Sequence, residues 1–183
     1  MADTPLFTPT QFNTSLARDG NKYLQVIHLN MQSAVNKADE LTVLLDDLTC
    51  SSCFFDVIFL SETWYRADSD VIRIPGYNSF YINRTEKRGG GIAILIKNNY
   101  VCDVLSDHSL SNCNIEMLTV KSGRNIYSVV YRPPHGNLGE FLDVFERETF
   151  FFSSENYLTI IAGDFNIDMG TTNPMQQQSN FKP

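Results

Sequence analysis

The chain has 183 residues and a formal net charge of -7, which excludes a domain that grips nucleic acid by bulk positive charge alone but suits a site that gathers carboxylates around a divalent cation. Its hydrophobic fraction of 43% and charged fraction of 19% are those of an ordinary globular domain with a sizeable core. The sequence contains no run of about 18 apolar residues, so no membrane span is predicted.

The first half of the chain alternates apolar runs with polar turns. Residues 1–21 have little periodicity and predict a loose leader without the features of a signal peptide, which favours an intracellular protein. We predict a strand over Leu24–Leu29, and a strand buried on both faces over Asp56–Leu60. Between them, Ala34–Leu48 should be a helix, with apolar residues at positions 34, 38, 41, 44, 45 and 48 on one face. Tyr77–Ile82 is a further candidate strand.

The second half continues with strands and one more helix. Ile92–Ile96 follows three glycines and predicts a strand. Ile115–Val120 and Ile126–Tyr131 predict an antiparallel hairpin. Leu138–Phe152 is helical by pattern, and Leu158–Ala162 is the last predicted strand. The apolar face of that helix is predicted to contain Leu138, Phe141, Leu142 and Phe145.

The order of these elements predicts mixed sheets with helices on their outer faces. We expect residues 22–169 to form one domain and residues 170–183 to form a polar tail. Cys50 and Cys53 have the spacing of half a zinc site or a redox motif, but no second pair of ligands accompanies them. The sequence therefore favours two small buried thiols near a helix end.

Polar side chains follow three of the predicted strands. They are Asn30, then Glu62, then Asp164 and Asn166 on either side of Phe165. Any one of them is more often a turn former or helix cap. Together, at strand ends where α/β proteins bind ligands, they are the hard oxygen donors that Mg²⁺ accepts. In an extended segment Asp164 and Asn166 would point to one side and Phe165 into the core.

Six short motifs follow one another between residues 23 and 168: His28-Leu29-Asn30, Leu60-Ser61-Glu62-Thr63-Trp64, Ile74-Pro75-Gly76-Tyr77, Arg88-Gly89-Gly90-Gly91-Ile92-Ala93-Ile94, Tyr131-Arg132-Pro133-Pro134 and Gly163-Asp164-Phe165-Asn166. In this order they resemble the endonuclease/exonuclease/phosphatase superfamily, which includes exonuclease III, DNase I and apurinic endonucleases. The Gly-rich and Tyr-Arg-Pro-Pro motifs resemble, more narrowly, the apurinic-endonuclease-like domain of non-LTR retrotransposons. The resemblance implies an α/β (α+β) four-layer sandwich of two mixed β-sheets flanked by helices.

The resemblance also implies a role for each site residue. Glu62 would hold Mg²⁺, or Mn²⁺ in its place, with Asn30 beside it. Asp164 would position or deprotonate the attacking water, Asn166 would hold that water or the phosphate, and Tyr131 would hydrogen-bond the scissile phosphate. The reaction would nick DNA by phosphodiester hydrolysis. The 3′-hydroxyl left behind would prime reverse transcription by the reverse transcriptase region of the same polyprotein. The resemblance therefore implies that the protein acts on DNA in the nucleus.

The family pattern continues after Asn166 with further strands and a closing Ser-Asp-His, which this sequence lacks up to Pro183. We therefore expect a fold incomplete on its C-terminal side, with at most feeble activity. Ser106-Asp107-His108 spells that motif in the wrong place, so we interpret it as a chance match and predict that His108 lies away from the site. Two alternatives stay open: an inactive remnant that acts at most as a binding module, and a phosphatase or phosphodiesterase of the same superfamily.

Several residues near the motifs have two interpretations. Arg132 could contact a phosphate or be an ordinary exposed arginine. Arg84, Lys87 and Arg88 form a small basic loop that faces either DNA or solvent. His28 is predicted to be packed rather than catalytic.

Overall fold

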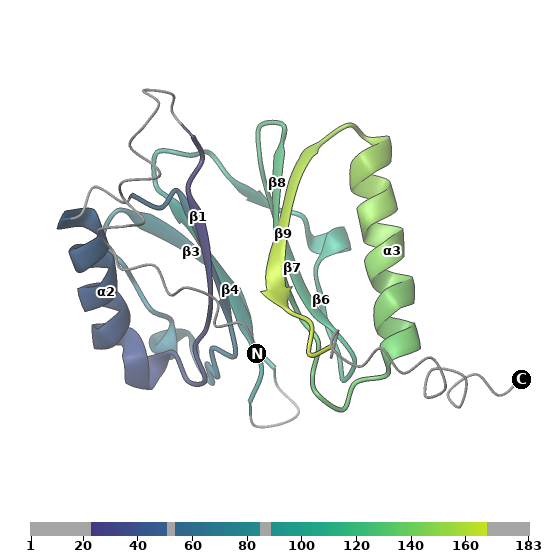
Figure 1. Cartoon of the computed structure of the whole chain (residues 1–183), viewed down its shortest axis with the longest axis horizontal. Coiled ribbons are helices and arrows are strands. Elements are labelled where there is room, and N and C mark those ends of the chain that lie inside the picture. Colours follow the sequence, from purple (N-terminus) through teal and green to yellow (C-terminus); the bar gives the residue numbers. More distant parts are fainter. Residues whose placement is uncertain (1–22, 51–53, 85–88, 168–183) are drawn as a thin grey trace, which may run out of the picture.

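The computed structural model describes residues 23–50, 54–84 and 89–167. Two β-sheets lie face to face, and one long helix covers the outer face of each (Figure 1). This arrangement confirms the predicted four-layer sandwich of mixed sheets. The predicted leader, the polar tail and Cys53 lie outside the described residues.

The first sheet has the strand order β1-β2-β4-β3. β1 is parallel to β2, whereas β4 is antiparallel to both β2 and β3. A short 3-10 turn and then helix α2 connect β1 to β2, as expected for a crossover between parallel strands. The bounds are β1 Val26–Asn30, the 3-10 turn Val35–Lys37, α2 Ala38–Cys50, β2 Val57–Ser61, β3 Tyr77–Ile82 and β4 Ile92–Lys97.

The second sheet has the order β5-β7-β8-β9, with β6 also paired to β7. β7 and β8 form the predicted antiparallel hairpin, and α3 connects β8 to the parallel strand β9. The bounds are β5 Asp103–Val104, a 3-10 turn Ser106–His108, β6 Leu110–Ser111, β7 Glu116–Ser122, β8 Asn125–Tyr131, α3 Leu138–Ser154 and β9 Leu158–Asp164.

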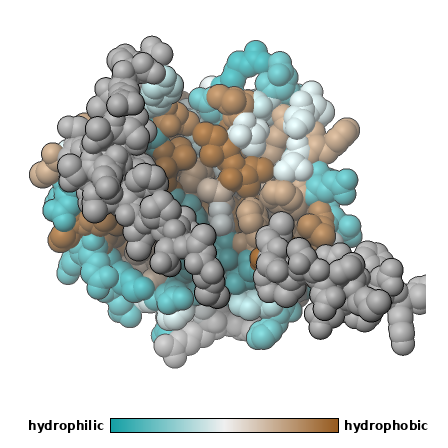
Figure 2. Space-filling model, in the orientation of Figure 1, coloured by the Kyte–Doolittle hydropathy of each residue, from teal (hydrophilic) through white to brown (hydrophobic). Residues whose placement is uncertain are grey.

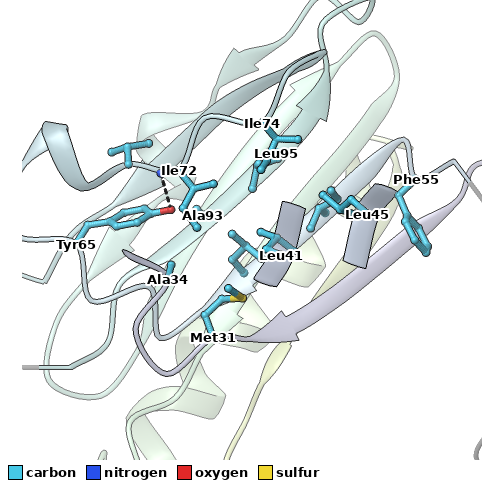
Figure 3. Packing of buried hydrophobic residues seen from close by; sticks show 13 residues of the cluster. Met31, Ala34, Leu41, Leu45, Phe55, Tyr65, Ile72, Ile74, Ala93 and Leu95 are labelled. Carbon is cyan, nitrogen blue, oxygen red and sulfur yellow. Dashed lines mark hydrogen bonds between the residues drawn. The ribbon is translucent and has the colours of Figure 1, made fainter. Parts of the chain in front are cut away.

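Three apolar layers hold the four structural layers together. Leu41 and Leu45 of α2 belong to one buried cluster with Ile58 and Leu60 of β2. Figure 3 shows the two leucines of α2 facing the sheet side by side with Ala93 and Leu95 of β4. The alternate residues of β2, which include Phe59, point into the layer between the two sheets. β2 is therefore buried on both faces, which is why its sequence is a continuous apolar run. The third layer lies between the second sheet and α3 and contains Ile115, Met117, Ile126, Val130, Phe141 and Phe152.

The buried stripe of α3 differs from the predicted one. It passes through Phe141, Glu148 and Phe152, whereas Leu138 is 42% exposed and Leu142 47% exposed. Leu142 follows Phe141 by one residue, so it is rotated by about 100° from the line that faces the sheet. The prediction that both leucines lie on the buried face was wrong.

Helix α2 is also more exposed than predicted. Leu44 is 40% exposed because it is rotated away from the line of Leu41 and Leu45. Cys50 is exposed as well, so its interpretation as a buried thiol was wrong. It is the last residue of α2 and lies beyond Leu45, the last buried residue of that helix.

Strands β1 and β9 are open edges within the described residues. They lie on the face of the molecule that Figures 1 and 2 show, where hydrophobic residues gather between the two sheets. Leu158 at the start of β9 is 65% exposed, and Val26 at the start of β1 is 37% exposed. This face therefore presents both unpaired backbone groups and apolar side chains. No helix in the described part of the chain is long and apolar enough to cross a membrane.

Candidate active site

The polar residues predicted from the strand ends meet at one end of both sheets. In the first sheet, Asn30 is in register with Ser61, which immediately precedes Glu62. In the second sheet, Tyr131 is in register with Asp164 on one side and with Glu116 on the other. Residues in register on neighbouring strands point to the same face of a sheet. Glu116, Tyr131 and Asp164 therefore form a row that faces the first sheet.

Asn30 connects the two sheets. Its Nδ2 donates to Glu62 Oε1 at 3.0 Å and to Asp164 Oδ2 at 2.8 Å. One neutral amide thus contacts two carboxylates that come from residues 102 positions apart in the sequence. The predicted proximity of Asn30, Glu62 and Asp164 is confirmed.

Asn166 is held by the backbone around Arg132. Its backbone N–H donates to Asp164 Oδ1 at 3.1 Å, and its Nδ2 donates to the carbonyl of Arg132 at 2.7 Å. The Asn166 backbone is left-handed, with φ 47°, so the segment is not extended as predicted. The Asn166 amide is therefore engaged by Arg132, whereas Phe165 packs on Phe141 as expected.

Arg132 is 9% exposed, so the interpretation as an exposed arginine was wrong. Its Nη1 donates to the carbonyl of Asn166 at 3.0 Å, and its backbone N–H donates to the carbonyl of Asp164 at 2.9 Å. The side chain stays inside because the loop after Asp164 folds over it. Arg132 thus fixes the Asp164–Asn166 segment against the end of β8.

Tyr131 is only 4% exposed. Burial and, after it, the charge of Glu62 raise the pKa of the phenol to about 12, against the opposing effect of the Arg84 guanidinium. The hydroxyl is therefore a neutral hydrogen-bond donor throughout the physiological range. A neutral donor beside two carboxylates can bind an oxygen of an approaching phosphate.

His28 lines an open, shallow pocket of about 600 Å³ together with Asn30, Asp164, Phe165 and Asn166. Its Nε2 lies 3.1 Å from Ser61 Oγ. Burial lowers the pKa of the imidazole, and the nearby Asp164 only partly opposes this effect. His28 was predicted to be packed rather than catalytic; its side chain is half-buried against Ser61 and also lines the site.

His108 lies elsewhere, as predicted. Its ring stacks on Phe151 of α3 with centroids 4.0 Å apart, and Nδ1 pairs with Glu148 Oε2 at 2.7 Å. α3 covers the outer face of the second sheet, whereas the site lies on the inner face. The tripeptide 106–108 is a 3-10 turn against that helix.

The donors in the site fit a hard divalent cation. Within residues 23–50, 54–84 and 89–167, no group of three His, Cys, Asp or Glu side chains is placed to hold a metal ion, so a cation here would rely on two carboxylates, an amide and water. Glu62 and Asp164 supply two carboxylates within reach of one atom of Asn30. Such a set, with water completing the shell, suits Mg²⁺ or Mn²⁺.

Comparison with known proteins places the chain in a family. The sequence profile described as the Endonuclease/Exonuclease/phosphatase family matches residues 11–181. The chain belongs to this family. No curated protein sequence matches the chain.

Solved structures of this family share the fold at low identity. The endonuclease domain of TRAS1, a telomere-specific non-LTR retrotransposon, is 14% identical, with a TM-score of 0.54 over 80% of this chain and 62% of that one. An AP endonuclease from Archaeoglobus fulgidus is 13% identical, with a TM-score of 0.51 over 79% of this chain and 58% of that one. TDP2 of D. rerio, complexed with a single-strand DNA product, is 18% identical, with a TM-score of 0.51 over 79% of this chain and 61% of that one. This chain therefore spans about three fifths of the length of these family members.

The sequence did not predict one pair of residues beside the site. Glu116 is fully buried, and its carboxylate pairs with Arg84 Nη2 at 2.5 Å. Arg84 was predicted to face either DNA or solvent, but it is engaged in this pair, while Lys87 and Arg88 lie outside the described residues. A carboxylate at the start of an apolar strand was the available signal, because a buried charge needs a partner.

Proposed function

We propose that this chain carries the metal-binding side of the active site of a DNA endonuclease, which nicks target DNA by phosphodiester hydrolysis and leaves a 3′-hydroxyl. The observation that supports it most is the Asn30 amide bridging Glu62 and Asp164, with Tyr131 in register beside them. Two carboxylates and a neutral phenol in one site can bind a cation and a phosphate together.

Each residue has a distinct task in this proposal. Glu62 and Asn30 would hold Mg²⁺, and the bound ion would neutralise negative charge at the phosphate and at the leaving oxygen. Asp164 orients or deprotonates the attacking water. Tyr131 donates a hydrogen bond to a non-bridging oxygen of the phosphate. Asn166 holds the water or phosphate near Asp164 with the side-chain groups that its bond to the Arg132 carbonyl does not use.

The TRAS1 endonuclease and the DNA-bound D. rerio TDP2 support DNA as the substrate through their shared fold. The Gly-rich and Tyr-Arg-Pro-Pro motifs favour a retrotransposon endonuclease among the members of this family. In such an element, the freed 3′-hydroxyl would serve the reverse transcriptase region of the same polyprotein in the nucleus.

The proposal is tested by binding Mn²⁺ to residues 1–183 and by nicking supercoiled plasmid. Glu62→Ala should weaken Mn²⁺ binding by tenfold or more, and Asp164→Ala, which removes the second negative charge beside Asn30, should weaken it severalfold. Asp47→Ala, an exposed carboxylate on α2, is the matched control and should leave binding unchanged. Mn²⁺ affinity equal in all four proteins would reject the site.

The nicking assay separates the substrate classes. We expect nicking by residues 1–183 to be feeble and abolished by either site substitution, and a longer protein that continues past Pro183 should be faster. Faster hydrolysis of a small aryl phosphate than of plasmid would favour a phosphatase of the same family. Mn²⁺ binding without hydrolysis of either substrate, even in the longer protein, would favour a binding module.

A further inference from the structure

The most unusual charge in the described chain is the carboxylate of Glu116, which is fully buried at the start of β7. Burial raises the pKa of this carboxyl, and the adjacent Arg84 guanidinium opposes the rise. The side chain makes two contacts: Oε1 pairs with Arg84, and Oε2 accepts the backbone N–H of Gly91 at 2.6 Å. A buried ion pair seldom adds net stability, so stability alone does not account for it.

The Arg84 side of the pair reaches Tyr131. The guanidinium carbon lies 5.9 Å from the centre of the Tyr131 ring, and Glu116 is in register with Tyr131 on the neighbouring strand. The Arg84 side chain is 15% exposed. Glu116 thus holds a cation against the face of the proposed phosphate-binding phenol, where cation–π attraction adds to the contact.

The Gly91 side of the pair reaches Glu62. The carbonyl of Gly91 accepts from the Thr63 backbone N–H at 3.0 Å, and the carbonyl of Gly90 accepts from that of Trp64 at 2.9 Å. Glu62 itself has a left-handed backbone, with φ 53°, so its conformation depends on how firmly Thr63 and Trp64 are held. The glycine turn holds these two residues directly after Glu62.

The turn requires glycine. Gly91 has φ +80°, and a Cβ there would lie 2.6 Å from Thr63 Oγ1. Gly90 has φ +72°, and its Cβ would collide with the Glu116 carboxylate and would lie 2.8 Å from the Arg84 guanidinium carbon. The glycines therefore let the backbone approach the ion pair on one side and the Glu62 segment on the other.

We propose that the buried Arg84–Glu116 pair is the positioning element of the site, which sets Glu62 through the glycine turn and Tyr131 through the Arg84 guanidinium. This inference rests on the proposed function and adds two positioning residues to it. Neither residue needs to touch the metal or the substrate. Supporting groups of this kind commonly change metal affinity by 10- to 100-fold when they are removed.

The test compares single variants with a double variant that removes both charges, Arg84→Met with Glu116→Leu. Each single variant should lower the melting temperature, because it leaves one buried charge without its partner. The double variant should recover most of the melting temperature, because no buried charge remains. Trp64 is the only tryptophan of the chain and directly follows the Glu62–Thr63 peptide, so its fluorescence reports on that segment.

In the double variant we expect Trp64 to emit at longer wavelength and to be quenched more by acrylamide, and the Mn²⁺ dissociation constant to rise at least tenfold. Lys97→Met breaks a different ion pair, the 3.0 Å contact with Asp56 beside the start of β2, and is the control that should change neither reading. Wild-type fluorescence and Mn²⁺ affinity in a double variant that has recovered its melting temperature would overturn the inference.

A milder variant covers the case in which the double variant does not fold. Glu116→Gln keeps the size and an acceptor for Gly91 but loses the charge that holds Arg84. Because the Gly91 bond is kept, Trp64 emission and Mn²⁺ affinity should stay as in the wild type. Binding of inorganic phosphate to the Mn²⁺-loaded protein, which depends on Tyr131, should weaken severalfold, and unchanged phosphate binding would overturn the role of Arg84. If the wild type binds no Mn²⁺ at all, the proposed function fails. Trp64 emission in two single variants then tests the inference. Arg84→Met keeps the Glu116–Gly91 bond, whereas Glu116→Leu removes it, so only Glu116→Leu should shift the emission. Equal emission from the two variants would reject the inference.

Discussion

A single added charge at Asn30 tests whether the site is built for a cation. Asn30→Asp replaces the donor Nδ2, which lies 3.0 Å from Glu62 Oε1 and 2.8 Å from Asp164 Oδ2, by a carboxylate oxygen. Two favourable contacts become two repulsions without any change of side-chain size. The protein without metal should lose stability, whereas its affinity for a divalent cation should rise.

The magnitude follows from the distances. After relaxation to about 4 Å, each like-charge pair costs about 1 kcal/mol in water and about 4 kcal/mol near a protein surface. Asn30 is exposed, which favours the lower value, so a total loss of about 2–3 kcal/mol is expected at pH 8 and low salt. If the third carboxylate binds the cation, Mn²⁺ affinity should rise about tenfold. Saturating Mn²⁺ should then stabilise Asn30→Asp by about 1.4 kcal/mol more than it stabilises the wild type.

The assay is thermal or urea unfolding of the wild type and of Asn30→Asp, with and without Mn²⁺. Asn78→Asp, which adds the same charge at an exposed position of β3, is the control. The penalty at Asn30 should shrink with Mn²⁺ and with added salt, and should disappear below about pH 4, where carboxyl groups are protonated. A penalty that is equal with and without Mn²⁺, together with unchanged Mn²⁺ affinity, would refute the reasoning.

Three further outcomes follow from the structure. Gly163→Ala should lower the free energy of unfolding by about 3 kcal/mol or more in urea melts, because its Cβ would lie 2.7 Å from the carbonyl carbon of Val130 and nearer still to its oxygen. Glu148→Ala should cost about 1–3 kcal/mol by the same measurement, because it removes the buried acceptor of His108. Tyr131 has a folded-state pKa of about 12, above the value of about 10 for an unfolded chain, so stability is intact below pH 10 and falls as the pH rises towards 12. In the wild type this loss of stability should amount to about 2 kcal/mol between melts at pH 9 and at pH 12, and Tyr131→Phe should not show it. Equal pH dependence of the two proteins would contradict the burial of the phenol.

The strand ends were predictable because the relevant information is local. A short apolar run that stops at a polar residue indicates both the strand and the place where it ends. Parallel strands then bring their terminal residues to one edge, so Asn30 and Glu62 had to be neighbours. Asp164 meets them because β9 is parallel to β8 and its sheet faces the first one.

The buried faces of helices and the very short strands were harder to predict from the sequence. The hydrophobic pattern of α3 permits two adjacent stripes, and only the packing on the second sheet selects the one that contains Glu148 and leaves Leu142 exposed. β5 and β6 each have two residues, which is too few for any periodic pattern. Their pairing with β7 is a consequence of the tertiary fold.

The buried charged residues could not be predicted because their partners lie far away in the sequence. Glu116 and Arg84 are 32 residues apart, and each has an ordinary solvated interpretation in its own segment. Only the fold places the carboxylate under the glycine turn and the guanidinium over Tyr131. The same holds for Arg132, whose side chain is fixed by the carbonyl of Asn166 in the segment after β9, 34 residues further along the chain. Residues that can bind a ligand are marked by the ends of their own strands, whereas residues that hold them in place are defined by partners elsewhere in the chain, so the second group emerges only from the three-dimensional structure.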